Sequence, residues 1–249
     1  MAIEYNSYDD LPIAHLEAEL IRTALGNCTG LVVLDLGGGS GTYARQAVEA
    51  GAKQVDVVDI SDAMMRVGKD IEDKLSKESR IRWILADASK PMADQGADVL
   101  PPGQYDIVMA NWVFDHAHTV DDLRGMWLNI TTSLKPGAKF IGIRAIAPGC
   151  FAEHNTKEGK YGCLRTDIKQ IPGGVECKAT LLTNPPFTVG VTLMEDCYKM
   201  IDDIPRQLGL TDFGTVPDIE SDVVKSDPKF WKDHLEEPGF AVVTARRAE

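Results

Sequence analysis

Short apolar runs alternate along the first part of the chain with segments whose apolar residues recur every three or four positions. A short apolar run bounded by turn residues predicts a buried strand, and the longer period predicts an amphipathic helix. We predict a first helix over residues 12–25. The predicted strands then lie at 31–36, 54–60, 81–86, 105–110 and 139–146, with helices between them. Repeated strand–helix units of this kind are typical of a mostly parallel sheet with helices on both faces.

The alternation breaks after Pro148. Three strand-like segments follow, at 161–170, 175–182 and 187–194, separated by Pro-Gly-Gly and Asn-Pro-Pro turns. They predict an antiparallel insertion over residues 148–194. We expect one domain over residues 1–249, in which residues 1–30 form an N-terminal helical cap and the insertion forms a substrate lid.

Helical spacing resumes over residues 197–208, where Pro205 predicts a kink. Two further strands are predicted near 211–216 and 240–246. Between them, Asp227 followed by a proline is a typical helix start, with a capping residue and a proline at the first helical position. The remaining histidines, His15, His154 and His234, are expected at the surface or in the insertion.

The composition narrows the choice of partners and compartment. The formal net charge is −12 and no basic patch is visible, so we predict no nucleic-acid or anionic-membrane partner. The five cysteines are widely spaced and contain no Cys-x-x-Cys, which favours free thiols over a disulfide framework or a zinc site. We find neither a signal peptide nor a transmembrane stretch and predict a cytoplasmic protein, monomeric or homodimeric.

A glycine-rich loop follows the first predicted strand and contains Gly37, Gly38, Gly39 and Gly41. Glycine allows positive φ and a close backbone approach to a ligand, and the N–H groups of the next helix attract polar or anionic groups. Ligands of open α/β sheets bind at the carboxyl ends of the strands, where this loop lies. A nucleotide-like ligand is therefore predicted.

Two ligand classes fit this loop. The pattern Gly39-x-Gly41-x-x-Ala44 matches the relaxed dinucleotide motif, with Asp59 about 20 residues further on, so an NAD-dependent oxidoreductase is one reading. However, Asp35 lies just before the glycines and suits a ligand with a cationic amino-acid end. Strand three ends in Asp87 and a small alanine, where an adenine could lie, and the sequence contains no Tyr-x-x-x-Lys pair.

The stretches LDLGGGSG, VVDIS, ADAS and ANWVFDH together resemble the class I S-adenosylmethionine-dependent methyltransferases, over nearly the whole chain. The resemblance is strongest to small-molecule enzymes of the ubiquinone/menaquinone type and of microbial natural-product pathways, including those acting on toxoflavin-like heterocycles. It implies a Rossmann-like α/β fold: a seven-stranded, mostly parallel sheet with an antiparallel last strand, helices on both faces, and an antiparallel insertion after strand five. It implies S-adenosyl-L-methionine as the cofactor.

The resemblance also implies individual roles. Gly37, Gly39 and Gly41 would lie against the methionine part of the cofactor, Asp59 would bind the ribose hydroxyls and Asp87 the adenine N6. Ile60 and Ala88 would sandwich the adenine, Asn111 would bind the ammonium end, and Tyr5 and Tyr8 would cover the cofactor. The full predicted cofactor set is Tyr8, Asp35, Gly37, Gly38, Gly39, Asp59, Ile60, Asp87, Ala88, Asn111 and Trp112. Plain structural alternatives stay open: Asp35 could pin the loop, and Asn111 could simply form a turn.

His116 is the candidate catalytic residue, because a histidine after strand four could accept a proton near neutral pH. His118 completes a His-x-His, but no further ligand cluster accompanies it, so no metal is predicted. Four insertion residues, Phe151, Tyr161, Arg165 and Phe187, suggest a ring-bearing acceptor. The expected reaction is methylation of a small molecule, at oxygen first and nitrogen next, in secondary metabolism. A non-catalytic protein with this fold is the third reading.

Overall fold

The computed structural model describes residues 8–75, 80–96 and 100–249, so Tyr5 lies outside the described residues. Its main sheet has seven strands in the order β3-β2-β1-β4-β5-β10-β9. The strands are β1 (Val32–Leu36), β2 (Gln54–Asp59), β3 (Ile81–Leu85), β4 (Tyr105–Met109), β5 (Leu134–Ala145), β9 (Leu210–Thr215) and β10 (Phe240–Arg247). Pairs among the first five are parallel, whereas β10 is antiparallel to both β5 and β9. The predicted fold class is confirmed.

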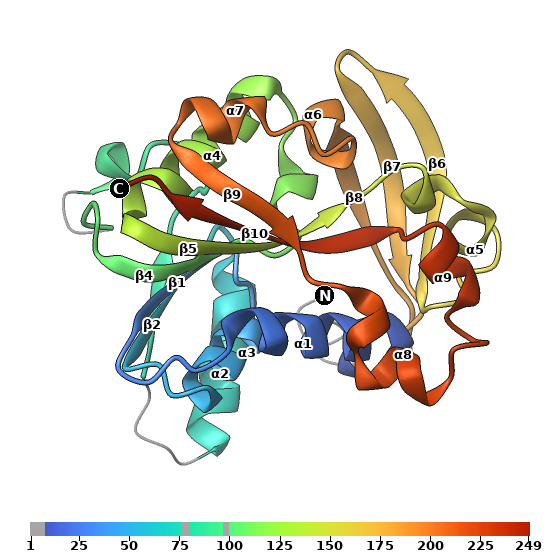
Figure 1. Cartoon of the computed structure of the whole chain (residues 1–249), viewed down its shortest axis with the longest axis horizontal. Helices are drawn as coiled ribbons and strands as arrows, with labels where there is room; N and C mark the ends of the chain where they lie inside the picture. Colours follow the sequence, from blue (N-terminus) through green and yellow to red (C-terminus); the bar gives the residue numbers. More distant parts are fainter. Residues whose placement is uncertain (1–7, 76–79, 97–99) are drawn as a thin grey trace.

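Helices cover both faces of this sheet (Figure 1). The longer ones are α1 (Pro12–Leu25), α2 (Thr42–Glu49), α3 (Asp62–Lys74) and α4 (Val120–Ser133); the shorter ones are α5 (Glu153–Thr156), α6 (Glu195–Tyr198), α7 (Asp203–Gln207), α8 (Asp222–Ser226) and α9 (Lys232–Glu236). Side chains alternate along β1: Val33 packs in the core beneath α1 and α2, and Leu34 and Leu36 pack in the core beneath α4. Asp35 therefore points to the α1–α2 face.

Helix α1 lies across the sheet and forms part of one wall of the site. Pro12 occupies its first turn, where a missing N–H costs nothing, and Gly26 ends it with a φ of 61°. Its apolar face is buried, but Glu17 on the same face is also buried. A buried carboxylate on an otherwise apolar helix face marks a polar contact within the protein.

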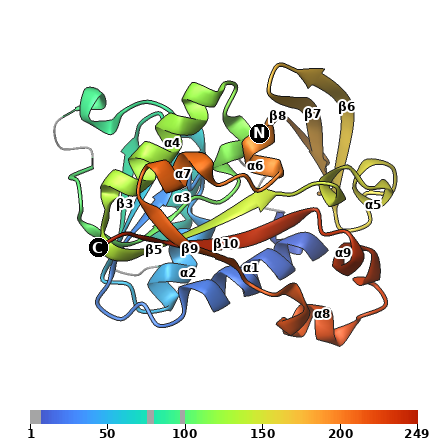
Figure 2. The ribbon, with the colours of Figure 1, turned by 45° about the horizontal axis from the view of Figure 1, so that its top comes forward.

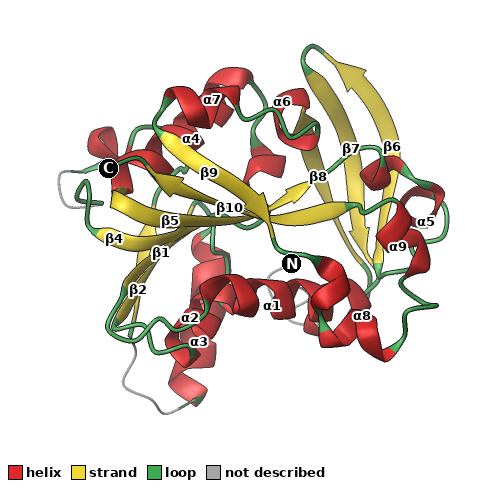
Figure 3. Ribbon diagram, viewed as in Figure 1, coloured by secondary structure: helices red, strands yellow, loops and turns green. Residues whose placement is uncertain are grey.

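The insertion forms a second, three-stranded antiparallel sheet, β6 (Cys163–Ile171), β7 (Gly174–Leu181) and β8 (Phe187–Met194), in the order β6-β7-β8. Figure 3 shows it as a separate group of strands beside the main sheet, and Figure 2 shows it from a second side. One of its faces carries Cys163, Val175, Cys177, Leu181 and Leu193, all buried. The insertion therefore packs against the body of the protein through one face.

The helix predicted over residues 197–208 is wrong as a single element. The chain forms α6 and α7 instead, with Met200 at a φ of 56° between them. Arg144 of β5 holds this break: its guanidinium donates to the backbone carbonyls of Asp196 and Cys197 and to the Asp202 carboxylate. Pro205 lies in the first turn of α7, where it breaks no helical hydrogen bond.

Two other local expectations also need correction. The Asp227–Pro228 pair forms a turn, in which the Asp227 carboxylate accepts from the Phe230 N–H, and α9 begins only at Lys232. His234 is buried, not at the surface; its Nε2 lies 2.8 Å from an Asp218 carboxylate oxygen, among aromatic rings that include Tyr161. No helix in the described part of the chain has the length and apolarity needed to span a bilayer.

Candidate functional site

A cavity of about 770 Å³ opens at the carboxyl ends of β1, β2 and β4, between the main sheet and the insertion. We call its two parts the loop end and the insertion end. The loop end is lined by Gly37, Gly39, Asp59, Ile60, Asp87, Ala88 and Asn111; the insertion end is lined by Cys163, Arg165, Ala179, Leu181, Phe187, Val189 and Val191. Tyr8, Glu17, Trp112, Asp115, His116 and His118 also line the cavity.

The backbone of the glycine loop passes directly under the cavity. Gly37 and Gly39 have φ values of 74° and 56°, and a Cβ added to Gly37 would lie 2.5 Å from a Val113 methyl carbon. Only glycine fits that position without strain. The loop therefore exposes backbone to a ligand at a place where any larger residue would close the approach.

Asp59 ties the loop to the end of β2. Its two carboxylate oxygens accept from the N–H of Gly39 at 2.8 Å and from the N–H of Ser61 at 2.7 Å. Burial raises its pKa above the ordinary value, although these two donors oppose the shift. A carboxylate has about four acceptor positions, so Asp59 can hold the loop and still accept from ligand hydroxyls in the cavity.

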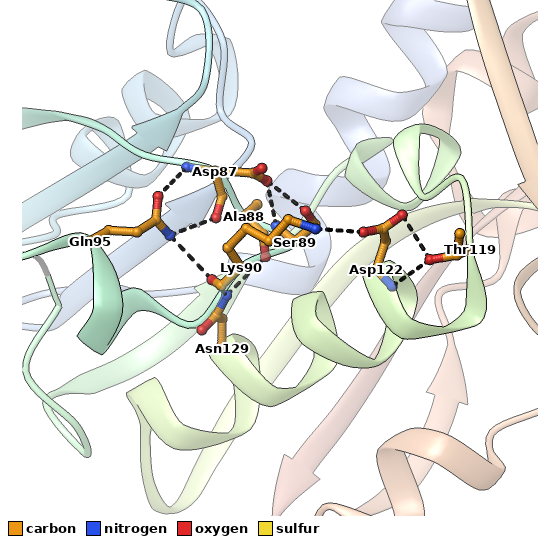
Figure 4. A network of polar contacts seen from close by, with 8 residues as sticks. All are labelled: Asp87, Ala88, Ser89, Lys90, Gln95, Thr119, Asp122 and Asn129. Atoms are coloured by element: carbon orange, nitrogen blue, oxygen red, sulfur yellow. Dashed lines mark hydrogen bonds and ion pairs between the residues drawn. The ribbon is translucent and has the colours of Figure 1, made fainter.

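The loop after β3 is held by a polar network, shown in Figure 4. An Asp87 carboxylate oxygen accepts from the backbone and the hydroxyl of Ser89, while the Asp87 N–H donates to Gln95. The side-chain amide of Asn129 donates to the carbonyls of Ala88 and Lys90. The network fixes Asp87 and Ala88 at the cavity, which is the placement that the adenine contacts require.

A smaller cavity of about 60 Å³ lies beneath the glycine loop, lined in part by Tyr8, Asp35, Gly38, Asn111 and Trp112. Several polar atoms here are buried without a hydrogen-bond partner of normal geometry: both Asp35 oxygens, both terminal atoms of the Asn111 amide and the Trp112 indole nitrogen. Burial, and next the nearby Asp59, raises the pKa of Asp35 to about 7. Unsatisfied buried polar groups are rare in folded proteins, so this cluster fits a ligand with charged amino and carboxylate groups.

Gly38 and Gly41 lie apart from the large cavity. A Cβ on Gly38 would be 2.6 Å from an Asp35 oxygen, so this glycine makes room for that carboxylate. Gly41 lines neither cavity; it precedes α2 with a φ of 79°, and its Cβ would meet the Trp83 ring. Gly41 is therefore required for packing against Trp83, and it does not face either cavity.

His116 ends the short 3-10 helix η3 (Val113–His116) and faces the cavity. Its surroundings lower its pKa, chiefly by desolvation, whereas the charge of Asp59 acts in the opposite direction. The neutral imidazole is therefore the favoured form near pH 7, as a proton acceptor requires. His118 also lines the cavity, and its Nδ1 lies 3.1 Å from the Thr192 hydroxyl.

Among the ionisable groups of the cavity that were not singled out from the sequence, Glu17 and Asp115 are buried. Glu17 accepts from the hydroxyls of Tyr8 and Tyr43 at 2.6 and 2.7 Å, and burial raises its pKa to about 7. Burial also raises the pKa of Asp115 to about 7. Glu17 lies in the middle of α1, outside any motif; Asp115 lies in η3 within the ANWVFDH stretch, where the resemblance assigned it no role.

Of the four insertion residues expected near a ring-bearing acceptor, Arg165 and Phe187 line the cavity. Phe151 instead packs on Tyr198, and Tyr161 stacks on Trp231. The described residues contain no group of three or more histidine, cysteine or acidic side chains arranged for a metal ion.

Comparison with known proteins agrees with this geometry. Residues 33–137 match the family model described as a methyltransferase domain. The ubiquinone/menaquinone biosynthesis C-methyltransferase of Ectopseudomonas mendocina is 30% identical over 120 residues, which are 47% of this chain and 43% of that protein. The chain thus matches less than half the length of the curated relatives.

Two solved structures share the fold over most of this chain. An S-adenosylmethionine-dependent methyltransferase from Mesorhizobium loti has a TM-score of 0.59 at 18% identity, covering 91% of this chain and 95% of that one. The 1,6-didemethyltoxoflavin-N1-methyltransferase of Burkholderia thailandensis, with bound 1,6-didemethyltoxoflavin and S-adenosylhomocysteine, has a TM-score of 0.54 at 16% identity, covering 93% and 79%. The chain shares the fold of these S-adenosylmethionine-dependent methyltransferases, and its residues 33–137 match a methyltransferase domain, in agreement with the sequence resemblance.

Proposed function

We propose that this protein binds S-adenosyl-L-methionine at the loop end of the cavity and transfers its methyl group to a small molecule held at the insertion end. The observation that carries the proposal is that one cavity joins Gly37, Asp59 and Asp87 to His116 and to the apolar insertion wall. A methyl donor and its acceptor must share one enclosed space, because the transfer is an in-line displacement.

At the loop end, Asp59 would bind the ribose hydroxyls and Asp87 the adenine amino group, with Ile60 and Ala88 against the ring. Asn111, Trp112 and Tyr8 would surround the amino-acid end, and the ionised Asp35 would favour its ammonium group. The bound cofactor supplies an activated sulfonium methyl group. The unsatisfied atoms beneath the loop support this placement, since a ligand with both amino and carboxylate groups would satisfy them.

At the other end, residues 148–194 would form the lid over the acceptor, together with the N-terminal cap. His116 would accept the proton that an oxygen or nitrogen nucleophile loses on methylation, and oxygen is the acceptor we favour, in secondary metabolism. Most of the rate would come from alignment, because orientation is worth up to ~7–11 kcal/mol and a general base ~10²–10⁴-fold. The structure of the toxoflavin enzyme, which contains bound 1,6-didemethyltoxoflavin, is consistent with a heterocyclic acceptor.

The test separates three functions. Calorimetry with S-adenosylhomocysteine should show saturable binding to the full chain, whereas NAD⁺ should show none. Tight binding of NAD⁺ in place of S-adenosylhomocysteine would support the oxidoreductase reading and end this proposal. Transfer of a labelled methyl group from the cofactor to an extract fraction would then exclude the non-catalytic reading, and binding without any transfer would support it.

A further inference from the structure

Arg165 is the charged residue in an apolar wall at the insertion end. On β6 it pairs with Ala179 of β7, which pairs with Val189 of β8, so one row across the sheet reads Arg, Ala, Val. The next cavity-facing row is Cys163, Leu181 and Phe187. Arg165 and its small neighbour Ala179 both line the cavity.

The guanidinium of Arg165 has no hydrogen-bond or ion-pair partner among the described residues. Its side chain is only 4% exposed, its Nε is buried without a hydrogen bond, and no ion pair joins it to a described carboxylate. Arg144 is a useful contrast: it is equally buried, yet it donates to the Asp202 carboxylate and to two backbone carbonyls. A buried cation is costly unless it is paired, so Arg165 is arranged for a partner that enters the cavity.

The other charged groups of the cavity do not supply that partner. Asp115 and Glu17 line the same cavity but form no ion pair with Arg165, and burial raises the pKa of each to about 7, which reduces their negative charge. The second cation in the described lining, Lys90, is already paired with Asp122 at 2.9 Å. A negatively charged ligand group in this cavity would therefore meet Arg165.

We propose that Arg165 binds a carboxylate of the methyl acceptor, and that the acceptor is a planar aromatic or heteroaromatic acid. This inference rests on the proposed function. A guanidinium presents a planar set of donors that matches the two oxygens of a carboxylate. Its Cζ lies 6.0 Å from the centre of the Trp112 ring, and the apolar side chains of Leu181 and Val189 line the same wall, so a flat ring with a carboxylate fits there.

The test uses matched acids and amides as probes. 4-Hydroxybenzoate and 4-hydroxybenzamide, and 2-naphthoate and 2-naphthamide, are titrated into the full chain by ligand-observed NMR, with and without S-adenosylhomocysteine. We expect at least one acid to bind about tenfold or more tightly than its amide, as charge-assisted hydrogen bonds predict.

Arg165→Gln should remove that preference for the acid. Lys169→Gln, which removes an exposed charge on the same strand, should keep it. Equal or absent binding of acids and amides by the wild-type chain would overturn the inference, as would a preference that survives Arg165→Gln.

The thermal stability of an Arg165 variant is a second test, because a structural role and a ligand-binding role of Arg165 predict opposite changes in the thermal midpoint. Arg165→Met removes an unpaired buried charge, so the thermal midpoint of the ligand-free protein should stay the same or rise. A fall of several degrees would show that Arg165 is a structural ion-pair partner and would overturn the inference. Calorimetry with S-adenosylhomocysteine distinguishes failure of the two proposals. If the wild-type chain does not bind S-adenosylhomocysteine, the proposed function is contradicted. If it binds S-adenosylhomocysteine but does not prefer acids to amides, only the role of Arg165 is contradicted.

Discussion

The loop end and the insertion end of the cavity are built in different ways. At the loop end the ligand-facing groups are backbone amides and carboxylates on turns that follow β1, β2 and β3, and they hold one another, as Asp59 holds the N–H of Gly39. At the insertion end the wall consists of side chains on β6, β7 and β8, with Arg165 unpaired among apolar neighbours. The fold preorganises the loop end, whereas under our proposal a bound acceptor would supply the missing partner at the insertion end.

The largest expected effect concerns the loop end. Asp59→Ala removes the anchor of Gly39 and Ser61 together with the proposed ribose contact. Hydrogen bonds to charged groups contribute ~1.5–3 kcal/mol each, so S-adenosylhomocysteine binding should weaken by at least about 100-fold. Calorimetry measures the change. Asp62→Ala is the matched control, since Asp62 starts α3 and pairs with Arg66 at the surface; binding within threefold of wild type in the Asp59 variant would contradict the assignment.

This contrast also explains what could be predicted from the sequence. The loop end is encoded locally: glycines after a buried strand, and a carboxylate at the end of each of the next two strands, lie at positions that the strand–helix pattern alone identifies. The spacing between Gly39 and Asp59 is the length of one helix and one strand, and the structure joins these two residues directly. The seven-stranded sheet and its antiparallel last strand came from the family resemblance, and both are confirmed; the order of the strands was not predicted.

The contacts of the insertion end could not be predicted from local sequence patterns, because they depend on the pairing of strands whose residues are far apart in the chain. The sequence placed Tyr161 and Arg165 in one group, but only the register of β6 on β7 turns Arg165 to the cavity, while Tyr161 stacks in an aromatic cluster. Glu17 lies on a helix whose pattern predicts only core contacts. The break between α6 and α7 depends on Arg144, more than fifty residues earlier in the chain.

His116 connects the two ends, and we expect a smaller effect from its loss. His116→Asn should reduce the methyl-transfer rate by about 10²-fold, at the lower end of the range for a general base, and leave S-adenosylhomocysteine binding unchanged. Because the pKa of His116 is lowered, wild-type activity should persist to a lower pH than an ordinary histidine would allow. Transfer of labelled methyl groups across pH measures both effects. His118→Asn is the control, and an equal loss in both variants would contradict a specific role for His116.

Alanine substitutions at two glycines, one at each end of the cavity, test how tightly the two ends are packed. Gly37→Ala places a Cβ at positive φ and 2.5 Å from Val113, so it should destabilise the fold by ~1–3 kcal/mol and weaken S-adenosylhomocysteine binding. Gly190→Ala, on β8 of the insertion, meets no atom within 4 Å and should change stability by less than ~0.5 kcal/mol. Urea unfolding of both variants measures the difference. Equal destabilisation would show that the loop end is no more constrained than the insertion.

A further comparison concerns the pH dependence of stability. The pKa of Asp115 is raised from 3.8 to about 7, so between these values the folded state holds a proton that the unfolded state has released. Stability therefore falls as pH rises through this window, by up to ~1.4 kcal/mol per pH unit for one group. Glu17 and Asp35 add to the same trend, since their pKa values are also raised to about 7.

Asp115→Asn removes one of these three contributions, so urea unfolding from pH 5 to 6.5 should show a shallower fall in stability than in the wild-type chain. S-adenosylhomocysteine should reduce the part that Asp35 contributes, because its ammonium group favours the ionised carboxylate, and should leave the Asp115 part in place. In the wild-type chain, binding of S-adenosylhomocysteine should therefore make the decrease in unfolding free energy between pH 5 and 6.5 shallower. In the ligand-bound Asp115→Asn variant the decrease should be shallower still. Identical slopes in wild type and variant, with and without the ligand, would mean that the pKa of Asp115 is not raised in the folded state and that its carboxylate is ionised in the cavity that Arg165 also lines.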